Sequence, residues 1–185
     1  MLEHFQPILI DDYLATEYLY LGNIDPDHQL RVLEQALNPQ LIVSDTINCW
    51  IDTKREQFMN VIAKSHILLI NNEEIRLLSG VNNLVKCSKI ALDWGVKCIV
   101  IKKGEHGALL SNKTCVFPTP AYPVAEVVDP TGAGDAFAGG FLGHIARKQA
   151  VTEQTLKEAV VYGHVMGSFV VEDFRVNRLL ALSNT

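Results

Sequence analysis

One stretch of the sequence decides the fold: Asp129-Pro130-Thr131-Gly132-Ala133-Gly134-Asp135. Residues 127–128 before it are typical of the end of a strand, and the small and apolar residues after it predict a helix that is buried on every side. Small residues at a helix start leave backbone N–H groups uncovered at the positive end of the helix dipole. We therefore expect the amides of Gly132, Ala133 and Gly134 to form an anion site.

The last residue of the stretch, Asp135, places a carboxylate in the first turn of the same helix. A carboxylate beside an anion site repels a stored phosphate, but it can take a proton from a hydroxyl group that attacks a bound phosphoryl group. Asp135 is therefore the candidate general base. The simpler alternative is that Gly132 and Gly134 make a tight turn and Asp135 only caps the helix.

Two common phosphate-binding motifs do not fit the chain. The P-loop needs Gly-Lys-Ser or Gly-Lys-Thr, and neither occurs. The dinucleotide-binding fingerprint, which would indicate a plain NAD-binding domain, needs a third glycine where Phe137 stands. The stretch instead closely resembles the second signature of the PfkB family of carbohydrate and nucleoside kinases, Asp-x-Thr-Gly-Ala-Gly-Asp. The resemblance covers the chain from about residue 18 to the end.

Length, charge and cysteine usage narrow the class of protein. A chain of 185 residues suits a single domain, and its net charge of −5 argues against nucleic acid or an anionic membrane as a partner. The four cysteines are scattered, which predicts reduced thiols in a cytoplasmic protein. The six histidines have no regular spacing and predict no metal cluster.

Short apolar runs alternate with helical patterns along the chain. Strands are expected at 7–10, 18–21, 41–43, 67–70, 98–101, 115–117 and 124–128, and helices from 25, at about 52–63, 71–80, 83–94, 133 onward and 153–171. Continuous apolar strands between helices predict an α/β fold with a parallel sheet covered on both faces. The resemblance implies a ribokinase-like three-layer sandwich with a mostly parallel central sheet, without the N-terminal part and lid.

Ligands of such sheets bind beyond the carboxyl ends of the strands, which places Asp45, Asn71, Lys102 and Asp129 at one edge. Asn71 and Glu74 resemble the family's Asn-x-x-Glu motif, which implies that they shape the hydrated Mg²⁺ environment. Mg²⁺ keeps several waters and is often bound through a carboxylate. An N-cap made by Asn71 explains the same residues without a metal. A second register, starting at Asn72, ranks lower.

The turn Lys102-Lys103-Gly104-Glu105-His106-Gly107 follows the strand at 98–101. It resembles the family's Gly-x-x-Gly turn, which lies against the nucleotide phosphates. Gly104 and Gly107 allow close approach of the backbone, and Lys102 supplies a point charge for phosphate. For Lys103, we favour the alternative of a solvated side chain.

The helix predicted at 153–171 contains Gly163 and Gly167, whose spacing favours tight helix packing. The resemblance places this helix against the adenine, so that Gly163 and His164 border the base. A packed histidine is an equally good interpretation of His164.

The best overall interpretation is an ATP-dependent phosphotransferase that moves the γ-phosphoryl group to a hydroxyl of a sugar or nucleoside. Asp135 is its base, and Thr131 and Asp129 shape the phosphate loop. The resemblance also implies Mg²⁺ and a monovalent cation such as K⁺ beside Asp129. Family members are considerably longer, so the alternatives are a non-catalytic nucleotide-binding remnant or one piece of a split kinase. We expect a homo-oligomer or a partner that supplies the missing half.

Overall fold

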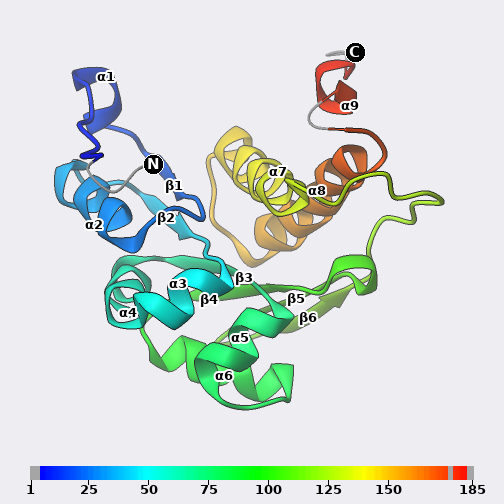
Figure 1. Ribbon diagram of the computed structural model, residues 1–185, viewed down its shortest axis with the longest axis horizontal. Helices are drawn as coiled ribbons and strands as arrows, with labels where there is room; N and C mark the ends of the chain where they lie inside the picture. The colour runs from blue at the N-terminus through cyan, green and yellow to red at the C-terminus, as the bar shows by residue number, and fades with distance from the viewer. Residues whose placement is uncertain (1–4, 175–176, 183–185) are drawn as a thin grey trace. The chain divides into compact units, whose positions relative to one another are not determined.

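The structure is a computed structural model that describes residues 5–174 and 177–182. Strands and helices alternate along it, as the sequence predicts (Figure 1). The strands are β1 (Tyr18–Leu21), β2 (Leu41–Ser44), β3 (Ile67–Asn71), β4 (Cys98–Lys102), β5 (Ala108–Asn112) and β6 (Val116–Thr119). The helices are α1 (Asp11–Leu14), α2 (Pro26–Gln35), α3 (Asn48–Thr53), α4 (Arg55–Lys64), α5 (Asn72–Ser79), α6 (Leu84–Asp93), α7 (Ala133–Lys148), α8 (Glu153–Val171), α9 (Asn177–Leu180) and the 3₁₀ helix η1 (Gly104–His106).

All six strands belong to one sheet, in the order β1-β2-β3-β4-β5-β6. The pairs β1–β2 and β2–β3 are parallel, with Tyr18 opposite Leu41 and Val43 opposite Ile67. The α/β class with a mostly parallel sheet is therefore confirmed. None of the helices in the described residues is both long enough and apolar enough to cross a membrane.

The chain divides into two compact units, and each is described by itself. The first unit comprises residues 1–101 and 111–116, and the second comprises residues 102–110 and 117–185. The predicted organisation as a single domain stays a prediction.

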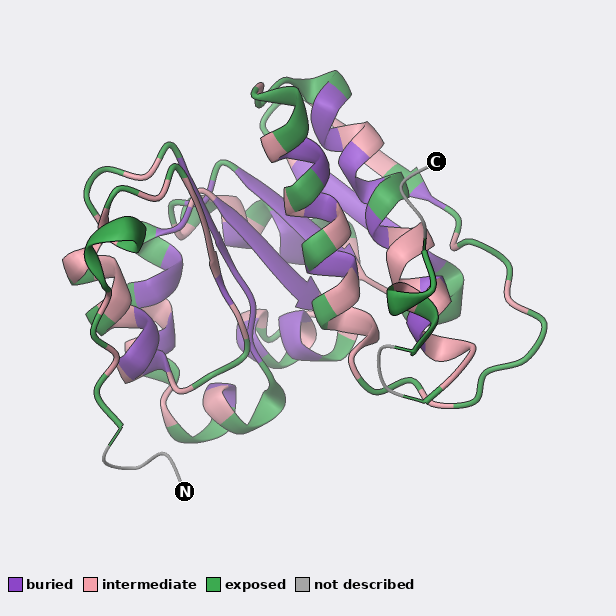
Figure 2. Cartoon of the chain, turned by 90° about the horizontal axis from the view of Figure 1, so that it is seen from above, coloured by how far each residue is buried: buried purple, intermediate pink, exposed green. Residues whose placement is uncertain are grey.

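The core of the first unit is built on β2, β3 and β4. Every residue of 67–70 and 98–101 is buried, as continuous apolar strands predict (Figure 2). Helix α4 contributes Phe58, Val61 and Ile62, which are fully buried as the sequence predicts. Burial of a large apolar side chain stabilises a fold by about 1.5–3 kcal/mol, so these strands and α4 hold the unit together.

Helix α2 begins, and helix α5 ends, where the sequence predicts. The Asp25 side chain caps α2 by accepting the N–H of Asp27 at 3.0 Å, with Pro26 at the first helical position. Helix α5 ends at Gly80, whose φ of 73° lies in the left-handed region that favours glycine.

The second unit is built around the packing of α7 against α8. Phe137 and Phe141 of α7 are buried and stack at a centroid distance of 6.3 Å. A β-carbon at Gly140 would come within 2.6 Å of Met166, so the two helix backbones approach closely only with glycine there. Gly140 is therefore required by the packing of α7 against α8.

Two predicted strands are wrong. Residues 7–10 form no strand, because the Gln35 side chain accepts the Leu9 N–H and donates to the Pro7 carbonyl, each at 2.9 Å, which holds this segment on α2. Residues 124–128 also form no strand. Val127 is 62% exposed there, and the Val128 N–H donates to the Val171 carbonyl at 2.7 Å.

Two predicted helices differ in detail. The helix expected at 52–63 is divided at Lys54, which has a φ of −137° between α3 and α4. Helix α7 is buried on one face only, because Asp135, Gly139, Gly143 and Arg147 form an exposed stripe at a spacing of four residues. The expectation that it is buried on every side is wrong.

Candidate functional site

The loop before α7 is shaped by Asp129 and Thr131. The Thr131 N–H donates to Asp129 Oδ1 at 2.9 Å, and this bond closes a tight turn. The N–H and hydroxyl of Thr131 together hold the pKa of the Asp129 carboxyl below its usual value. Asp129 is therefore a fixed negative charge in a fixed orientation. A carboxylate of this kind suits a bound cation, the role that the sequence predicts for it.

The turn then passes through Gly132, whose φ of 83° strains any other residue. Gly132 caps α7 without a side chain, and its carbonyl accepts the N–H of Ala136 at 2.9 Å. The chain thus enters helix α7 with no side chain larger than a methyl group at residues 132–134. Such a helix start leaves room for an anion.

The three amides predicted as the anion site are not equivalent. The Ala133 N–H donates to the Pro130 carbonyl at 3.2 Å. Within residues 5–174 and 177–182, no backbone acceptor pairs with the N–H groups of Gly132, Gly134 or Asp135. In this conformation the donors available to an anion are therefore these three amides, and the Ala133 amide is engaged.

Asp135 lies in the first turn of α7, and its side chain is exposed. Its position beside the helix N-terminus is the one that the sequence predicts. An exposed carboxylate next to uncovered amides is accessible to a hydroxyl group that approaches a bound phosphoryl group.

Lys102 reaches the same helix start from β4. Its Nζ lies 3.4 Å from the position that a β-carbon on Gly134 would occupy. The ammonium therefore lies close to the first turn of α7, and both an ammonium group and a helix N-terminus attract anions.

The turn after Lys102 contains the two glycines that the sequence predicts as phosphate-facing. Gly104 and Gly107 have φ values of 57° and 84°. A β-carbon on Gly107 would lie 1.9 Å from the Thr119 carbonyl oxygen, so glycine is required there for packing. At Gly104 nothing lies within 4 Å of a β-carbon, and only the positive φ favours glycine.

Gly163 and His164 of α8 serve packing in this structure. A β-carbon on Gly163 would lie 2.9 Å from the Phe137 ring. His164 Nε2 hydrogen-bonds to Thr119 Oγ1 at 2.9 Å, and its ring meets Phe137 edge to face. Burial lowers the pKa of His164, and the charge of Lys103 lowers it further. Their contact with an adenine stays a prediction.

In the first unit, Asn71 and Glu74 form a capping box. Asn71 Oδ1 accepts the N–H groups of Glu73 and Glu74 at 2.9 and 2.8 Å, and Glu74 Oε2 accepts the Asn71 N–H at 2.9 Å. Glu74 is only 5% exposed. The capping alternative is therefore present in the structure. Water-mediated Mg²⁺ binding by the same pair stays a prediction.

The sequence predicts four polar residues at one edge of the sheet, and the structure tests this for two of them. Asp45 follows β2 and Asn71 ends β3, and these strands are parallel neighbours, so both residues lie at the same edge of the sheet. Lys102 and Asp129 belong to the second unit. Their place relative to Asp45 and Asn71 stays a prediction.

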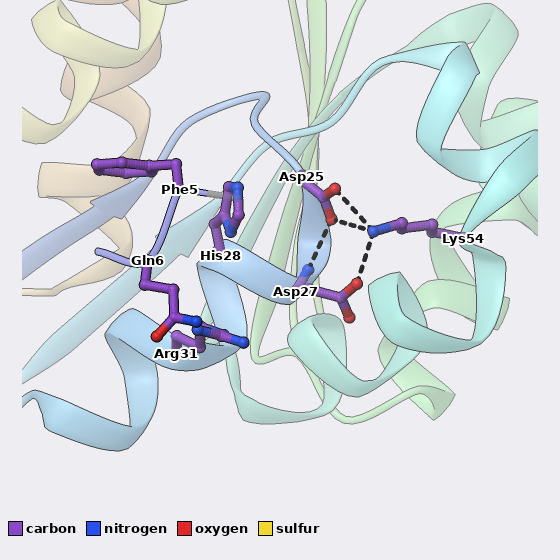
Figure 3. Close-up of a pocket in the computed structure, with 7 residues that line it drawn as sticks. All are labelled: Phe5, Gln6, Asp25, Asp27, His28, Arg31 and Lys54. Carbon is purple, nitrogen blue, oxygen red and sulfur yellow. Dashed lines mark hydrogen bonds and ion pairs between the residues drawn. The ribbon is translucent and has the colours of Figure 1, made fainter. Parts of the chain in front are cut away.

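A charged cluster in the first unit was not predicted from the sequence. Lys54 Nζ lies 2.7 Å from Asp25 and 2.6 Å from Asp27, at a polar hollow of about 230 Å³ (Figure 3). Burial pushes the pKa of Asp25 upward, but the hydrogen bonds from Lys54 and the Asp27 N–H outweigh it and leave that pKa lowered. The bond to Asp25 and the bond to Asp27 raise the pKa of Lys54.

This cluster ties the start of α2 to the junction between α3 and α4, and Arg31 and His28 line the same hollow (Figure 3). The Asp-Pro-Asp sequence signals a helix start, but no local pattern signals that Lys54, some 27 residues later, returns to it. No group of three or more His, Cys, Asp or Glu side chains that would suit a metal ion occurs in the described part of the chain.

Comparison with known proteins gives a consistent result. The pfkB family of carbohydrate kinases matches residues 3–180. A cytidine kinase of Thermococcus kodakarensis is 30% identical over 146 residues, which are 77% of this chain and 52% of the relative. A nucleoside kinase of Methanocaldococcus jannaschii is 26% identical over 157 residues, 85% of this chain and 49% of the relative.

A similar solved structure is aminoimidazole riboside kinase from Salmonella enterica, complexed with aminoimidazole riboside and an ATP analogue. Its TM-score is 0.75 at 25% identity, and the match covers 90% of this chain and 60% of that one. The chain thus spans about half the length of the curated relatives it matches.

Proposed function

Because the chain belongs to the pfkB family of carbohydrate kinases, we propose that it takes part in transfer of the γ-phosphoryl group of ATP to a hydroxyl of a riboside. The two curated relatives described above are named cytidine kinase and nucleoside kinase. The solved relative holds a riboside and an ATP analogue. These names favour a nucleoside over a simple hexose as the acceptor.

One observation carries the proposal: uncovered amides, an ammonium and a carboxylate meet at the start of α7. The Gly134 amide and the Lys102 ammonium face a bound phosphoryl group. Asp135, in the same turn, takes the proton of the attacking hydroxyl. Phosphoryl transfer depends mainly on position and on charge stabilisation, and these groups supply both.

The remaining residues have supporting roles in the proposal. Asp129 and Thr131 fix the loop and hold a monovalent cation such as K⁺, and Gly104 and Gly107 allow the turn to approach the nucleotide. The capping box of Asn71 and Glu74 acts on Mg²⁺ through the waters that the ion keeps, while one Glu74 oxygen accepts the Asn71 N–H. When bound, Mg²⁺ neutralises the charge of the phosphates. Gly163 and His164 border the base in this proposal, and a cytoplasmic setting is expected.

A second candidate function is kept as the alternative proposal. It is a nucleotide-binding protein without catalysis of its own, or one piece of a kinase assembled from two chains. The chain spans about half the length of its curated relatives.

A radiolabel experiment tests the proposal. The chain, in excess over [γ-³²P]ATP with Mg²⁺ and K⁺, is incubated with cytidine, other nucleosides, ribose and hexoses, and the products are separated by chromatography. We expect slow formation of a labelled nucleoside monophosphate that is abolished in Asp135→Asn. Label released only as inorganic phosphate, or not at all, favours the non-catalytic alternative.

A further inference from the structure

The loop of residues 128–132, which leads into α7, is mostly exposed. Residues 125–128, Pro130 and Thr131 are all exposed. The bond from the Thr131 N–H to Asp129 Oδ1 closes the turn, but it is local and does not attach the turn to the rest of the fold. An exposed loop keeps one shape where buried elements hold it. Helix α8 lies beside α7, and its last turn is where this loop is attached (Figure 1).

The backbone of the loop is bound to the C-terminal end of α8. The Val128 N–H donates to the Val171 carbonyl at 2.7 Å, and the Asp129 N–H donates to the same carbonyl at 3.4 Å. The last four carbonyl groups of a helix have no partner within the helix, so they can accept from another segment. The loop therefore pairs with an acceptor that α8 itself does not use, and this bond fixes the point from which the loop starts.

A side chain from the same turn of α8 lies beside the other end of the loop. Val170 is only 3% exposed, and its Cγ1 lies 3.8 Å from the position that a β-carbon on Gly132 would occupy. Three residues earlier, a β-carbon on Gly167 would lie 3.3 Å from the Ala133 carbonyl oxygen, so the backbone of α8 passes close to the first residue of α7. Helix α8 thus contacts the loop where it starts and where it ends.

We propose that the last turn of α8 holds the loop of residues 128–132 in place, and that Val170 is a positioning residue of the candidate site. Val170 contacts no substrate in this proposal. It acts by holding Gly132 and, through it, the first turn of α7, in which Asp135 lies. The catalytic consequence rests on the proposed function, because phosphoryl transfer requires Asp135 in a fixed position. The attachment of the loop to α8 rests on the contacts alone.

Amide hydrogen exchange followed by NMR tests the attachment without any substrate. The probes are the amides of Val128 and Ala133, which are hydrogen-bonded in the loop and at its end. In Val170→Ala they should exchange roughly tenfold faster, because truncation of a buried side chain removes contacts on which local protection depends. Val160→Ala is the matched control, since Val160 is fully buried on the same helix and lies about 15 Å away along its axis. It should leave the exchange of these two amides unchanged.

The carboxyl group of Asp129 gives a second signature. Hydrogen bonds from Thr131 lower the pKa of Asp129 in the closed turn. Release of the loop should move this pKa upward toward its ordinary value, which an NMR titration measures. Gly167→Ala tests the contact from the side of α8, because its β-carbon presses on the Ala133 carbonyl and should shift the signals of Ala133 and Asp129. If Val170→Ala does not fold, Gly167→Ala decides by the same measurements.

The outcomes for the loop do not depend on the proposed function. Faster exchange of the loop amides in Val170→Ala, but not in Val160→Ala, supports the attachment even if the parent chain transfers no phosphoryl group. That absence of transfer would contradict the kinase activity alone. Equal loop exchange in the parent and in a folded Val170→Ala, equal effects of Val170→Ala and Val160→Ala, or unchanged loop signals in Gly167→Ala would overturn the attachment.

Where the parent chain does transfer a phosphoryl group, single-turnover kinetics test the positioning role. Val170→Ala should lower the transfer rate at saturating ATP by roughly ten- to a hundredfold, because small displacements of reacting groups cost that much. The affinity for ATP should change less than the rate. Val170→Ile keeps both γ-carbons and should restore the rate. A transfer rate in Val170→Ala equal to that of the parent overturns the positioning role and leaves the proposed function intact.

Discussion

Gly163 of α8 lies against the ring of Phe137 of α7, so closely that a β-carbon at residue 163 would sit 2.9 Å from the ring. Among the described residues, none comes within 4 Å of the same hypothetical atom on Gly139, which lies on the exposed face of α7. The two glycines of this helix pair therefore differ. Gly163 is required by packing, whereas no contact in the described part of the chain requires glycine at residue 139.

Substitution of these glycines by alanine should change the free energy of unfolding in opposite directions. Gly163→Ala overpacks the contact with Phe137 and should destabilise the second unit by about 1–3 kcal/mol. Gly139→Ala should stabilise α7 by about 0.5–1 kcal/mol, the usual preference for alanine in a helix. Denaturant unfolding measures both. Equal effects of the two substitutions would contradict the packing role of Gly163.

The capping box allows the structural and metal roles of Glu74 to be separated. Glu74→Gln keeps an oxygen that accepts the Asn71 N–H, so the capping bond should be retained and the variant should stay folded. Asn71→Ala removes the acceptor for two backbone N–H groups and should destabilise by about 0.5–2 kcal/mol. Unfolding curves check both expectations.

The same pair tests the Mg²⁺ hypothesis. If Glu74 binds the hydrated ion, Glu74→Gln should raise the Mg²⁺ concentration needed for half-maximal MgATP binding. An unchanged Mg²⁺ requirement in a folded Glu74→Gln variant would leave Glu74 with the capping role alone.

The sequence predicted those parts of the fold that local patterns determine. The continuous apolar runs of β2, β3 and β4 are buried, as their sequences predict. Asp25-Pro26 marks a helix start and Gly80 marks a helix end by their own chemistry. Residues 7–10 and 124–128 carry similar apolar patterns but form no strand. Apolar content alone does not determine a strand when distant partners, here Gln35 and Val171, satisfy the backbone instead.

For the candidate site, the sequence predicted candidate residues but not the hydrogen bonds and contacts between them. The left-handed conformation of Gly132 and the place of Asp135 in the first turn follow from the local motif. The engagement of the Ala133 amide depends on how the turn closes on Pro130. The approach of Lys102 to Gly134 joins residues 32 positions apart in the sequence. No local pattern encodes such contacts.

The stability of the first unit should fall as the pH falls below about 6.5, the usual pKa of histidine. His66 Nδ1 accepts the Ile42 N–H at 3.0 Å, and burial together with the charge of Lys97 lowers the pKa of His66. The unfolded state therefore takes up the proton first. The stabilisation that neutral His66 contributes is complete above the pKa of His66 in the unfolded state. It is lost as the pH falls through the lower pKa of His66 in the folded state.

Thermal unfolding between pH 7.5 and 5 measures this dependence. His66→Gln should flatten the fall relative to the parent protein, whereas His106→Gln, at a ring that is 78% exposed, should leave it unchanged. An equal pH dependence of the melting temperature in the parent and in His66→Gln would contradict the proposed role of His66.

Asp135→Asn should separate binding from catalysis. Loss of a positioned base should lower the transfer rate by on the order of 10²–10⁴-fold. Nucleotide affinity should stay the same or rise, because a negative charge beside the uncovered amides of α7 is removed. Single-turnover kinetics and calorimetry with ATP measure the two effects, with Asp93→Asn as a control on an exposed carboxylate. A transfer rate within a few-fold of the parent would show that another group is the base.

The 185-residue chain should bind adenine nucleotide weakly and turn over a riboside poorly by itself. Apart from Asp135, its candidate site residues concern the phosphates, the base and the metal ions of the nucleotide, and the chain spans about half the length of its curated relatives. Positioning the attacking hydroxyl in line can account for about 7–11 kcal/mol of a barrier. If no residue of this chain positions the acceptor, Asp135 has only water to activate, and slow ATP hydrolysis is then the expected background. A coupled ADP-release assay against nucleosides, pentoses and hexoses measures this, and robust turnover of any one acceptor would show that its pocket is complete within these residues.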